Sequence, residues 1–404
     1  MSEQSETDVS RRRLLTVGGS VAVTAGLAGC TGGTDGTDST AATSGTETTP
    51  TETTRSTPTD DGSYSVTMEP MGEVAFESVP ESWMAYFSTY GDMGVALGQL
   101  DGLQGLIFTD NWPLQFYDYL PGVEVSFDDV TQLFGEGSLD KEAFYAMDSD
   151  VHLMDPNFIQ RLDDNWADED FEEIATNVGP IIGNSIRRRG EEWHDYRYYS
   201  LYDAFEKIAQ VFQERERYRA LKRVHDSFIA DVQSRLPAEA DRPKVGLLSV
   251  NSDFEEGSFY AYPTVDGGNG KKQYQDLGIG DAFGEHIDGG YAKWDYEQLL
   301  EADPDALVFS YGFSHATAEQ FESRMQAMRE DPVGRQLSAV QNDRLYRGGT
   351  SYQGPIVNLF QTEIAAKQFY PEVFGAWNGL DTLADESQRL FDHQQVADVI
   401  TGDF

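Results

Sequence analysis

The longest regular pattern of apolar and polar positions in the chain runs from Ser200 to Leu236. The stretch contains neither glycine nor proline, and apart from one gap its apolar residues recur at steps of three or four. Such spacing places the apolar side chains on one face of an α-helix. Pro237 follows directly and indicates the end of the helix, because proline cannot donate the next backbone hydrogen bond. The apolar positions are Leu201, Phe205, Ile208, Phe212, Leu221, Val224, Phe228, Val232 and Leu236.

The gap in this apolar stripe is filled by four charged residues, 214–217. One continuous helix over the stretch would be roughly 55 Å long at about 1.5 Å per residue, which exceeds the width of a small domain. A helix that is buried at each end and solvated in the middle is typical of a strut between two lobes, so we predict an interlobe helix at 199–237. A long surface helix and one half of a coiled coil are the alternatives that the pattern leaves open.

Short apolar segments alternate with helical segments on both sides of this stretch. Such alternation predicts parallel sheets covered by helices on both faces, and therefore an α/β fold with an N-terminal lobe at 64–198 and a C-terminal lobe at 238–404. The expected strands are 64–68, 83–87, 103–107, 130–133, 151–154, 244–250, 306–310 and 344–347. The expected helices are 92–100, 140–147, 274–277, 296–301, 318–330 and 355–369.

The N-terminal segment has the order of signals expected of an exported lipoprotein. A run of three arginines, 11–13, precedes an apolar segment, and Leu27-Ala28-Gly29 then leads to Cys30. We predict a twin-arginine lipoprotein signal peptide at 1–29 and lipidation of Cys30 at the outer face of the cell membrane. An uncleaved N-terminal anchor is the alternative. Residues 30–63 are rich in Thr, Ser, Gly and Asp, too poor in apolar surface to fold, and are predicted to be a disordered tether.

The charge balance excludes several classes of function. The chain has 404 residues and carries 70 Asp and Glu against 29 Lys and Arg, a net charge of -41. Such self-repulsion is tolerable where molar salt screens it, so the composition indicates a halophilic archaeon as source. Its sign argues against nucleic acid as a partner. Cys30 is the only cysteine, which excludes an internal disulfide, and the six histidines show no ligand spacing, so we expect no bound free metal.

One motif occurs in both halves of the chain. Residues 138–151 read SLDKEAFYAMDSDV and residues 295–308 read DYEQLLEADPDALV, each a helix followed by a turn and a strand. Together with the strut, this order of elements resembles the class III periplasmic binding proteins, which serve iron–siderophore and cobalamin ABC importers. The resemblance extends over roughly 73–375. Ser149 stands where proline is usual in the motif.

The resemblance implies two Rossmann-like α/β lobes joined by one long α-helix, with a ligand held between them. It implies a binding protein rather than an enzyme, without a resident cofactor, acting as a monomer beside an ABC permease dimer and its ATPase. The implied ligand is a ferric siderophore-type chelate, with cobalamin or haem as alternatives. Glu142 and Glu297 occupy matching positions in the two copies of the motif. In the family such glutamates pair with permease arginines; a solvated helix face is the alternative interpretation.

Five aromatic residues near predicted strand ends are candidate ligand contacts: Tyr90, Trp112, Tyr260, Tyr262 and Tyr352. Ring faces can cover the apolar, planar surface of a chelate while hydroxyls bond its oxygens. Ordinary loop packing is the alternative for each of them.

Arg187 is a further candidate ligand contact. It opens a run of three arginines in a chain that has few cations, and arginine favours bidentate contacts with anions. Local neutralisation of the neighbouring acidic residues is the alternative.

Two functions of a different class, an exported hydrolase and a sensor domain, lack their sequence signals. A hydrolase would be expected to show a nucleophile elbow or a cluster of metal ligands, and Gly-x-Ser-x-Gly is absent. A sensor would be expected to continue into a membrane helix and a signalling domain, and the sequence shows neither before Phe404.

Overall fold

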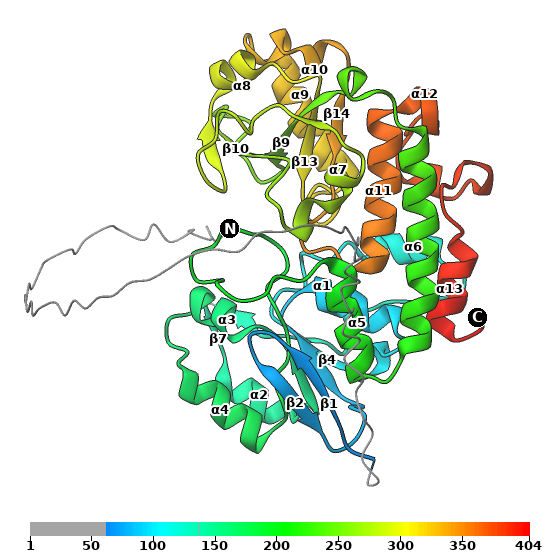
Figure 1. Ribbon diagram of the computed structural model, residues 1–404. Helices are drawn as coiled ribbons and strands as arrows, with labels where there is room; N and C mark the ends of the chain where they lie inside the picture. Colours follow the sequence, from blue (N-terminus) through cyan, green and yellow to red (C-terminus); the bar gives the residue numbers. More distant parts are fainter. Residues whose placement is uncertain (1–61, 136) are drawn as a thin grey trace, which may run out of the picture. The chain divides into compact units, whose positions relative to one another are not determined.

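The computed structural model describes residues 62–135 and 137–404, all of which belong to one compact unit, Arg55–Phe404 (Figure 1). The predicted signal peptide, Cys30 and all but the last two residues of the predicted tether lie outside the described residues. No helix in the described part combines the length and the apolar content needed to cross a membrane. The expectations about export and lipid anchoring therefore stay predictions.

The N-terminal lobe is built on a four-stranded sheet in the order β5-β4-β3-β8, with every neighbouring pair parallel. Every residue of β3 is buried, as expected of an uninterrupted apolar strand in the middle of a parallel sheet. The strands are β3 (Trp83–Ala85), β4 (Leu103–Leu106), β5 (Thr131–Gln132) and β8 (Val151–Leu153). The helices are α1 (Ser88–Ala96), α2 (Lys141–Met147), α3 (Pro156–Leu162) and α4 (Asp168–Asn177).

The C-terminal lobe contains a six-stranded sheet in the order β12-β10-β9-β13-β14, with β11 also paired to β9. The strands are β9 (Lys244–Ser249), β10 (Phe259–Tyr262), β11 (Gly280–Asp281), β12 (Ala292–Trp294), β13 (Ala306–Ser310) and β14 (Leu345–Arg347). The helices are α7 (Lys272–Asp276), α8 (Tyr296–Ala302), α9 (Ala318–Glu330) and α10 (Ser338–Gln341).

The sheet of the C-terminal lobe is mixed, which corrects the expectation of a wholly parallel sheet. β9 pairs in parallel with β13 and β11, whereas β10 runs antiparallel to both β9 and β12. The physical reason is the connection at 250–258, which is too short for the crossover of a dozen or more residues that a parallel neighbour requires.

The expected interlobe helix at 199–237 consists of two helices, α5 (Leu201–Val211) and α6 (Arg215–Arg235). The break falls at the gap in the apolar stripe, where Gln213 adopts a left-handed backbone conformation with φ 56°. Its side-chain amide donates a hydrogen bond to the carbonyl of Gln210 at 2.8 Å. The prediction of one continuous helix is therefore wrong: local hydrogen bonds end α5 where no apolar residue supports a further turn.

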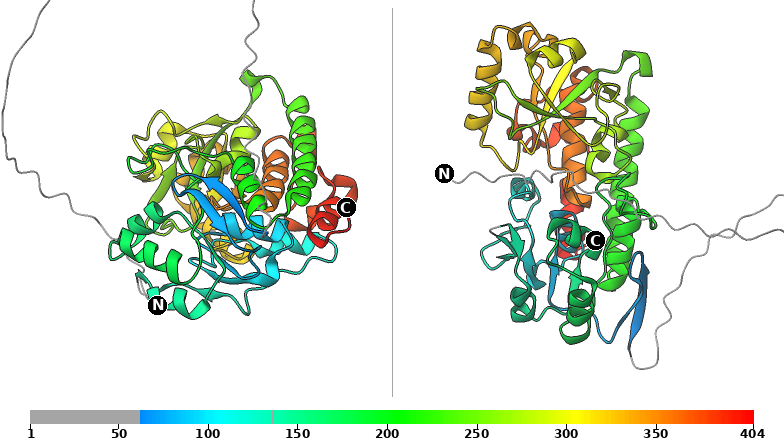
Figure 2. Two further views of the ribbon diagram at one scale, coloured as in Figure 1. Left: turned by 60° about the horizontal axis from the view of Figure 1, so that its bottom comes forward. Right: turned by 90° about the vertical axis from the view of Figure 1, so that its left-hand side faces the viewer.

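α6 is nevertheless a long helix, of 21 residues, and connects the two lobes (Figures 1 and 2). α5, which precedes it, packs against α1 and β1 of the N-terminal part. Near the C-terminal end of α6, the side-chain amide of Gln233 donates to the carbonyl of Asp276 on α7, at 3.4 Å. The lobes are thus joined by α5 and α6 in sequence rather than by a single rod.

Two small hairpins lie outside the main sheets. β1 (Tyr64–Met68) pairs antiparallel with β2 (Gly72–Phe76), and β6 (Phe134–Gly135) with β7 (Ser138–Leu139). The hydroxyl of Tyr64 donates to the carbonyl at the end of α5, so the first hairpin is attached to the connecting helices.

The C-terminal helices contact both lobes. α11 (Pro355–Phe369) is buried along its whole length and packs against α1 on one side and α7 on the other. α12 (Pro371–Phe374) follows at once, and α13 (His393–Thr401) packs against α6. The segment expected as the C-terminal lobe therefore also supplies helices that contact the N-terminal lobe.

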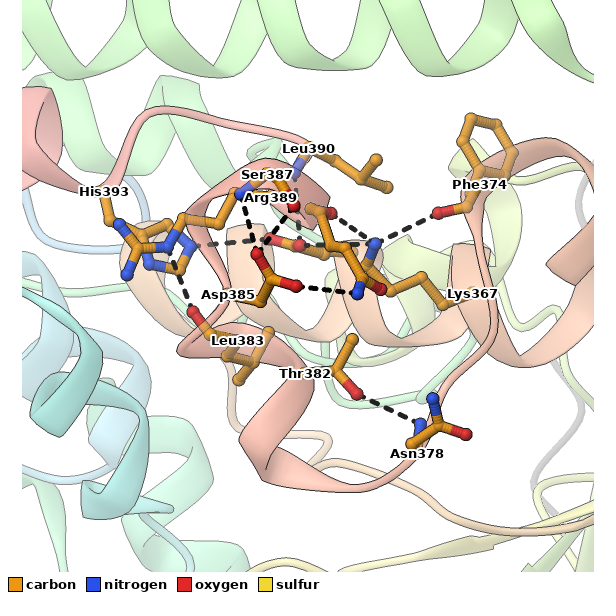
Figure 3. Close-up of polar contacts among 12 residues, drawn as sticks. Lys367, Phe374, Asn378, Thr382, Leu383, Asp385, Ser387, Arg389, Leu390 and His393 are labelled. Carbon is orange, nitrogen blue, oxygen red and sulfur yellow. Dashed lines mark hydrogen bonds and ion pairs between the residues drawn. The ribbon is translucent and has the colours of Figure 1, made fainter.

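A buried charge cluster holds the chain after α12 against α11. Glu363 and Lys367 of α11 form an ion pair with Oε1 and Nζ 3.8 Å apart. Lys367 also donates to the carbonyl of Phe374 at 3.0 Å, and the N–H of Leu390 donates to Glu363 at 3.1 Å (Figure 3). Nε2 of His393 lies 3.5 Å from the second oxygen of Glu363. A buried ion pair requires such additional partners, and here they come from the segment that α11 must hold.

Candidate ligand-binding site

The loops that follow β4 and β13 meet at the interface between the lobes. The side-chain amide of Gln115 donates to the carbonyl of Phe313 at 2.7 Å. Nε2 of His315 lies 3.1 Å from Oδ1 of Asn111. Both loops start at the carboxyl ends of parallel strands, where open α/β sheets bind their ligands. The candidate site is therefore this interface.

A row of aromatic rings crosses the interface. Phe87, at the end of β3, lies with its ring centroid 4.4 Å from that of Tyr352 and 4.8 Å from that of Phe158. Phe108 stacks on Phe87 at 5.9 Å, and Tyr311 lies 6.3 Å from Tyr352. We call these five residues the aromatic row. Three of them come from the N-terminal lobe and two from the C-terminal lobe, and all except Phe87 are partly exposed.

Arg187 lies over this row. Its guanidinium carbon is 4.8 Å from the ring centroid of Tyr352, a cation–π contact. Within residues 62–135 and 137–404, no carboxylate lies within ion-pair distance of Arg187, whereas the neighbouring Arg188 pairs with Glu191 at 3.3 Å. The backbone carbonyl of Arg187 accepts a hydrogen bond from the N–H of Gly270 at 2.9 Å, which attaches this segment to the C-terminal lobe. The three adjacent arginines are thus not equivalent: in the described residues Arg188 forms an ion pair with Glu191 and Arg187 forms none, while a ligand role for Arg187 stays a prediction.

Tyr90 and Trp112 have packing roles, which corrects their prediction as ligand contacts. Tyr90 is 0% exposed, and its hydroxyl donates to the carbonyl of Asn184 at 2.9 Å. Trp112 is 4% exposed, and its indole N–H donates to the hydroxyl of Tyr117 at 3.0 Å. The physical reason is that α1 begins at Ser88, earlier than predicted, so Tyr90 is part of a buried helix rather than of a loop.

Tyr260 and Tyr262 lie on the same side of β10, because side chains alternate along a strand. Both are partly exposed, and their ring centroids lie 6.1 and 6.3 Å from that of Tyr291, which is 55% exposed. Nζ of Lys271 lies 5.9 Å from the ring of Tyr262. These residues form a second aromatic group, and their role as ligand contacts stays a prediction.

Tyr352 is held at the interface by a network of buried amides. The side-chain nitrogen of Gln353 donates to the carbonyl of Asn269 at 2.9 Å, and its oxygen accepts from Gln361 at 2.7 Å. The hydroxyl of Ser88 in the opposite lobe donates to the carbonyl of Tyr352 at 2.9 Å. Because Gln353 is 1% exposed, these bonds fix the loop that presents the ring of Tyr352.

Sequence reasoning missed several residues of this interface, notably Phe87, Phe158, Tyr311, His315 and Asn251. Tyr311 and His315 follow β13, and Asn251 follows β9. Both strands were predicted, so the position of these residues in the loops after them could have identified them as candidates for the site. In the part of the chain that the structure describes, no group of three or more His, Cys, Asp or Glu side chains could hold a metal ion.

The repeated motif begins with an aspartate cap in both lobes, although Asp140 accepts from the second helical N–H and Asp295 from the third. Asp140 caps α2 by accepting from the N–H of Glu142 at 2.9 Å, and Asp295 caps α8 by accepting from the N–H of Gln298 at 3.0 Å. Glu142 and Glu297 are each the second residue of their helix, and both are exposed. The two glutamates thus occupy the same position in their helices, as they do in the two copies of the motif. Permease docking stays a prediction.

The turns after the two helices also match. Asp148 and Asp303 end their helices in the left-handed conformation, with φ of 50° and 35°. Asp150 then accepts from the N–H of Ser82 at 2.9 Å, and Asp305 accepts from the N–H of Lys244 at 2.8 Å. In both lobes the carboxylate ties the turn to the start of a neighbouring strand. The turns of the two copies are therefore anchored in the same way.

Comparison with known proteins agrees with this architecture. Residues 85–352, more than half of the chain, match the family model described as periplasmic binding protein. No curated protein matches the chain. Among solved structures, a periplasmic binding protein from Veillonella parvula is 18% identical, with a TM-score of 0.55 over 78% of this chain and 98% of its own.

Two further solved structures are similar in fold. The iron uptake ABC transporter substrate-binding protein PiuA from Streptococcus pneumoniae is 16% identical, with a TM-score of 0.52 over 74% of this chain and 96% of its own. The iron-uptake system-binding protein FeuA from Bacillus subtilis is 16% identical, with a TM-score of 0.52 over 76% of this chain and 99% of its own.

Proposed function

We propose that this chain, which belongs to the periplasmic binding protein family and has its class III fold, captures a ferric siderophore-type chelate between its lobes for an ABC importer. Members of the family bind solutes for transporters and are not enzymes. Two structures with the same fold, PiuA and FeuA, are iron-uptake binding proteins, which supports iron as the cargo.

The observation that carries the proposal is Arg187 beside the aromatic row. Ring faces from both lobes offer a surface for the apolar and planar parts of a chelate. The guanidinium of Arg187, which has no carboxylate partner in the described residues, supplies positive charge at the same place. Rings and an unpaired cation together favour a ligand that is bulky, partly planar and anionic.

Delivery of the chelate to the permease would use the two glutamates of the repeated motif. Glu142 and Glu297 offer one exposed carboxylate in each lobe, which suits a permease made of two related subunits energised by an ATPase. Each ion pair alone would contribute little in high salt, because surface pairs are weak and screened. Docking therefore also needs shape and apolar contact around the glutamates, and exposed Tyr145 on α2 is available for it.

The N-terminal segment would determine where the protein is held. Export by the twin-arginine route, lipidation at Cys30 and a tether at 30–63 would hold the binding unit at the outer face of the cell membrane. One copy of the unit carries both lobes, so the protein would act as a monomer.

The test is a binding titration of the purified chain in molar KCl, followed by tryptophan fluorescence. The panel contains a ferric hydroxamate, a ferric catecholate, haem and cobalamin, with the iron-free siderophores as controls. We expect saturable binding of one ferric chelate, and weaker binding of its iron-free form because that form lacks the compact shape of the complex. Binding of cobalamin or haem, with no response to either ferric chelate, would overturn the proposed ligand class.

A further inference from the structure

Tyr311, in the aromatic row, has a backbone conformation that tyrosine rarely adopts. Its φ is 61°, in the left-handed region where a side chain crowds the backbone. Four other non-glycine residues in the described part of the chain have a positive φ, and each follows the last residue of a helix by one or two positions, where this conformation is common. They are Asp148, Gln213, Asp303 and Asp343. Tyr311 follows β13 instead, so no helix end accounts for its conformation.

Hydrogen bonds in the turn after β13 hold Tyr311 in this conformation. Its N–H donates to the carbonyl of Gly349 at 2.9 Å, and its carbonyl accepts from the N–H of His315 at 2.8 Å. Glycine could make both backbone bonds without crowding, so the backbone of the turn does not require a tyrosine. The reason for a tyrosine at this position therefore lies in its side chain.

The side chain of Tyr311 lies beside the cation of the candidate site. Its hydroxyl is 2.7 Å from Oγ of Ser351, and the residue is partly exposed. Its ring centroid lies 6.3 Å from that of Tyr352, the ring that Arg187 covers. Burial raises the pKa of the Tyr311 hydroxyl and the guanidinium of Arg187 opposes this rise, so the two groups interact.

The hydroxyls of Tyr311 and Ser351 carry two hydrogens, and their mutual bond uses one. The described residues offer no acceptor for the second. This O–H and the guanidinium of Arg187 are together suited to a negatively charged oxygen. The ring faces of the aromatic row would cover a planar group attached to that oxygen.

Two carboxylates interact with Arg187 at longer range, and both are paired with other cations. They belong to Asp266 and Glu191, and neither lies within ion-pair distance of Arg187. Asp266 pairs with Nζ of Lys271 at 3.1 Å, and Glu191 pairs with Arg188 at 3.3 Å. A ligand oxygen near Arg187 would therefore not have to displace a carboxylate that is already bound there.

We propose that Tyr311 is a ligand-contact residue whose strained backbone places its ring and hydroxyl at the interface, where Tyr311, Ser351 and Arg187 bind a negatively charged oxygen carried by a planar group. Backbone strain of this kind opposes folding and persists where it positions a group for function. The inference rests on the proposed function for the identity of the ligand, and it names the part of that ligand which this end of the site recognises. It also predicts that relief of the strain weakens binding without weakening the fold.

The experiment measures stability and binding in the same variants of the full chain in molar KCl. The probe is anilinonaphthalene sulfonate, a dye with planar rings and one anionic group, whose fluorescence rises when it leaves water. Tyr311→Gly relieves the strained φ and removes the side chain. We expect its denaturation midpoint to equal or exceed that of the unsubstituted chain. Its affinity for the dye should fall about tenfold or more, because a ring contact and a hydrogen bond are both lost.

Tyr311→Phe separates the hydroxyl from the ring, and its affinity for the dye should fall about threefold to tenfold, the loss expected for one hydrogen bond. Tyr346→Phe is the matched control. Tyr346 is likewise partly exposed, but its ring packs on Phe369 at the end of α11 remote from Tyr352, so dye affinity should stay within about twofold.

Gln213→Gly is the control for strain, because it relieves a left-handed φ outside the candidate site. Its denaturation midpoint should not fall, and its affinity for the dye should equal that of the unsubstituted chain. A loss of dye affinity in Tyr311→Gly alone would therefore come from the missing side chain and not from a change of backbone strain.

Three results would overturn the inference. A lower denaturation midpoint in Tyr311→Gly would assign the tyrosine a structural role. Unchanged dye affinity in that variant, or no saturable dye binding by the unsubstituted chain, would exclude the contact. Titration of the same variants with the ferric chelates separates the two proposals: a chelate that binds Tyr311→Gly as tightly as the unsubstituted chain overturns this inference alone. Dye binding that depends on Tyr311, without binding of any ferric chelate, overturns the proposed function alone.

Discussion

The carboxylate of Asp92 on α1 accepts a hydrogen bond from the backbone N–H of Ile356, 264 residues later, at 2.9 Å. The same oxygen accepts from the N–H of Val357 at 3.0 Å, and the hydroxyl of Tyr117 donates to the other oxygen. A helix of the N-terminal lobe thus caps α11, whose first N–H groups have no partner within the helix. Gly354 permits the contact, since a Cβ there would lie 2.5 Å from Asp92.

The first prediction concerns the pH dependence of stability. Burial raises the pKa of Asp92 to about 7, against the opposing hydrogen bonds from Tyr117 and the backbone. The unfolded chain would lose this proton near pH 4 and the folded chain only near pH 7, so this group makes folding less favourable as the pH rises between them. The loss would be on the order of 4 kcal/mol at most, at about 1.4 kcal/mol per pKa unit.

Asp92→Asn isolates this contribution, because the other carboxylates titrate alike in both proteins. Denaturant melts of the two proteins at pH 4 to 8 should give a difference in unfolding free energy that shifts in favour of the variant as the pH rises. A difference independent of pH would show that folding does not raise the pKa of Asp92.

The second prediction concerns Arg187. Arg187→Gln removes a cation that has no carboxylate partner in the described residues, so ligand affinity should fall about tenfold to a hundredfold, the range for a charged hydrogen bond. Arg188→Gln is the matched control, since Arg188 is paired with Glu191 and should be replaceable within about threefold. Titrations with the chelate selected from the panel measure both; equal losses would exclude a specific role for Arg187.

The third prediction concerns docking. Reversing both charges in Glu142→Arg, Glu297→Arg should abolish uptake by cells and leave ligand affinity unchanged, because like charges would then face the permease arginines. Each single reversal should have an intermediate effect. Glu319→Arg is the control, because Glu319 is likewise exposed and likewise the second residue of its helix, α9. Normal uptake by the double variant would identify the two glutamates as ordinary surface carboxylates.

The fourth prediction concerns salt. A net charge of -41 should make the folded chain repel itself when the screening length is long. Thermal melts from about 0.1 M to several molar KCl should therefore show a rising melting temperature, with the Debye length falling from about 10 Å to below about 3 Å over that range. A melting temperature that does not change with salt would contradict the halophilic interpretation of the composition.

The fifth prediction concerns attachment to the membrane. Cys30→Ser removes the only thiol that could be lipidated, so the variant should move to the soluble fraction of cells or to the medium. Fractionation followed by immunodetection measures this, with the unsubstituted chain as control. Membrane association that is unchanged in the variant would favour an uncleaved N-terminal anchor.

Much of the fold was predictable because its signals are local. β13, α9 and α11 begin and end at the predicted residues, where apolar runs, a capping threonine at 317 and Pro355 set the bounds. The break between α5 and α6 was visible only as a gap in the apolar stripe. α5 ends there because Gln213 adopts a left-handed backbone conformation. Glutamine rarely adopts this conformation, so the residue type gives no sign of it.

The candidate site was predictable only in part. The loops at the ends of strands were predicted as its region, and two of the predicted residues, Arg187 and Tyr352, are in contact there. Tyr90 belongs to the core instead. α1 begins four residues earlier than predicted, so Tyr90 lies in this buried helix and not in a loop.

The sequence by itself determined many of the helices and strands, the repeated motif and the excess of negative charge, since these depend on composition and on neighbours within a few residues. Only the tertiary structure decided which residues meet across the lobes. Asn111 contacts His315 because the loops after β4 and β13 meet at one interface, and Asp92 contacts Ile356 because α1 packs against α11. Pairs separated by 204 and 264 residues leave no periodic trace in the chain, so their contacts follow from packing alone.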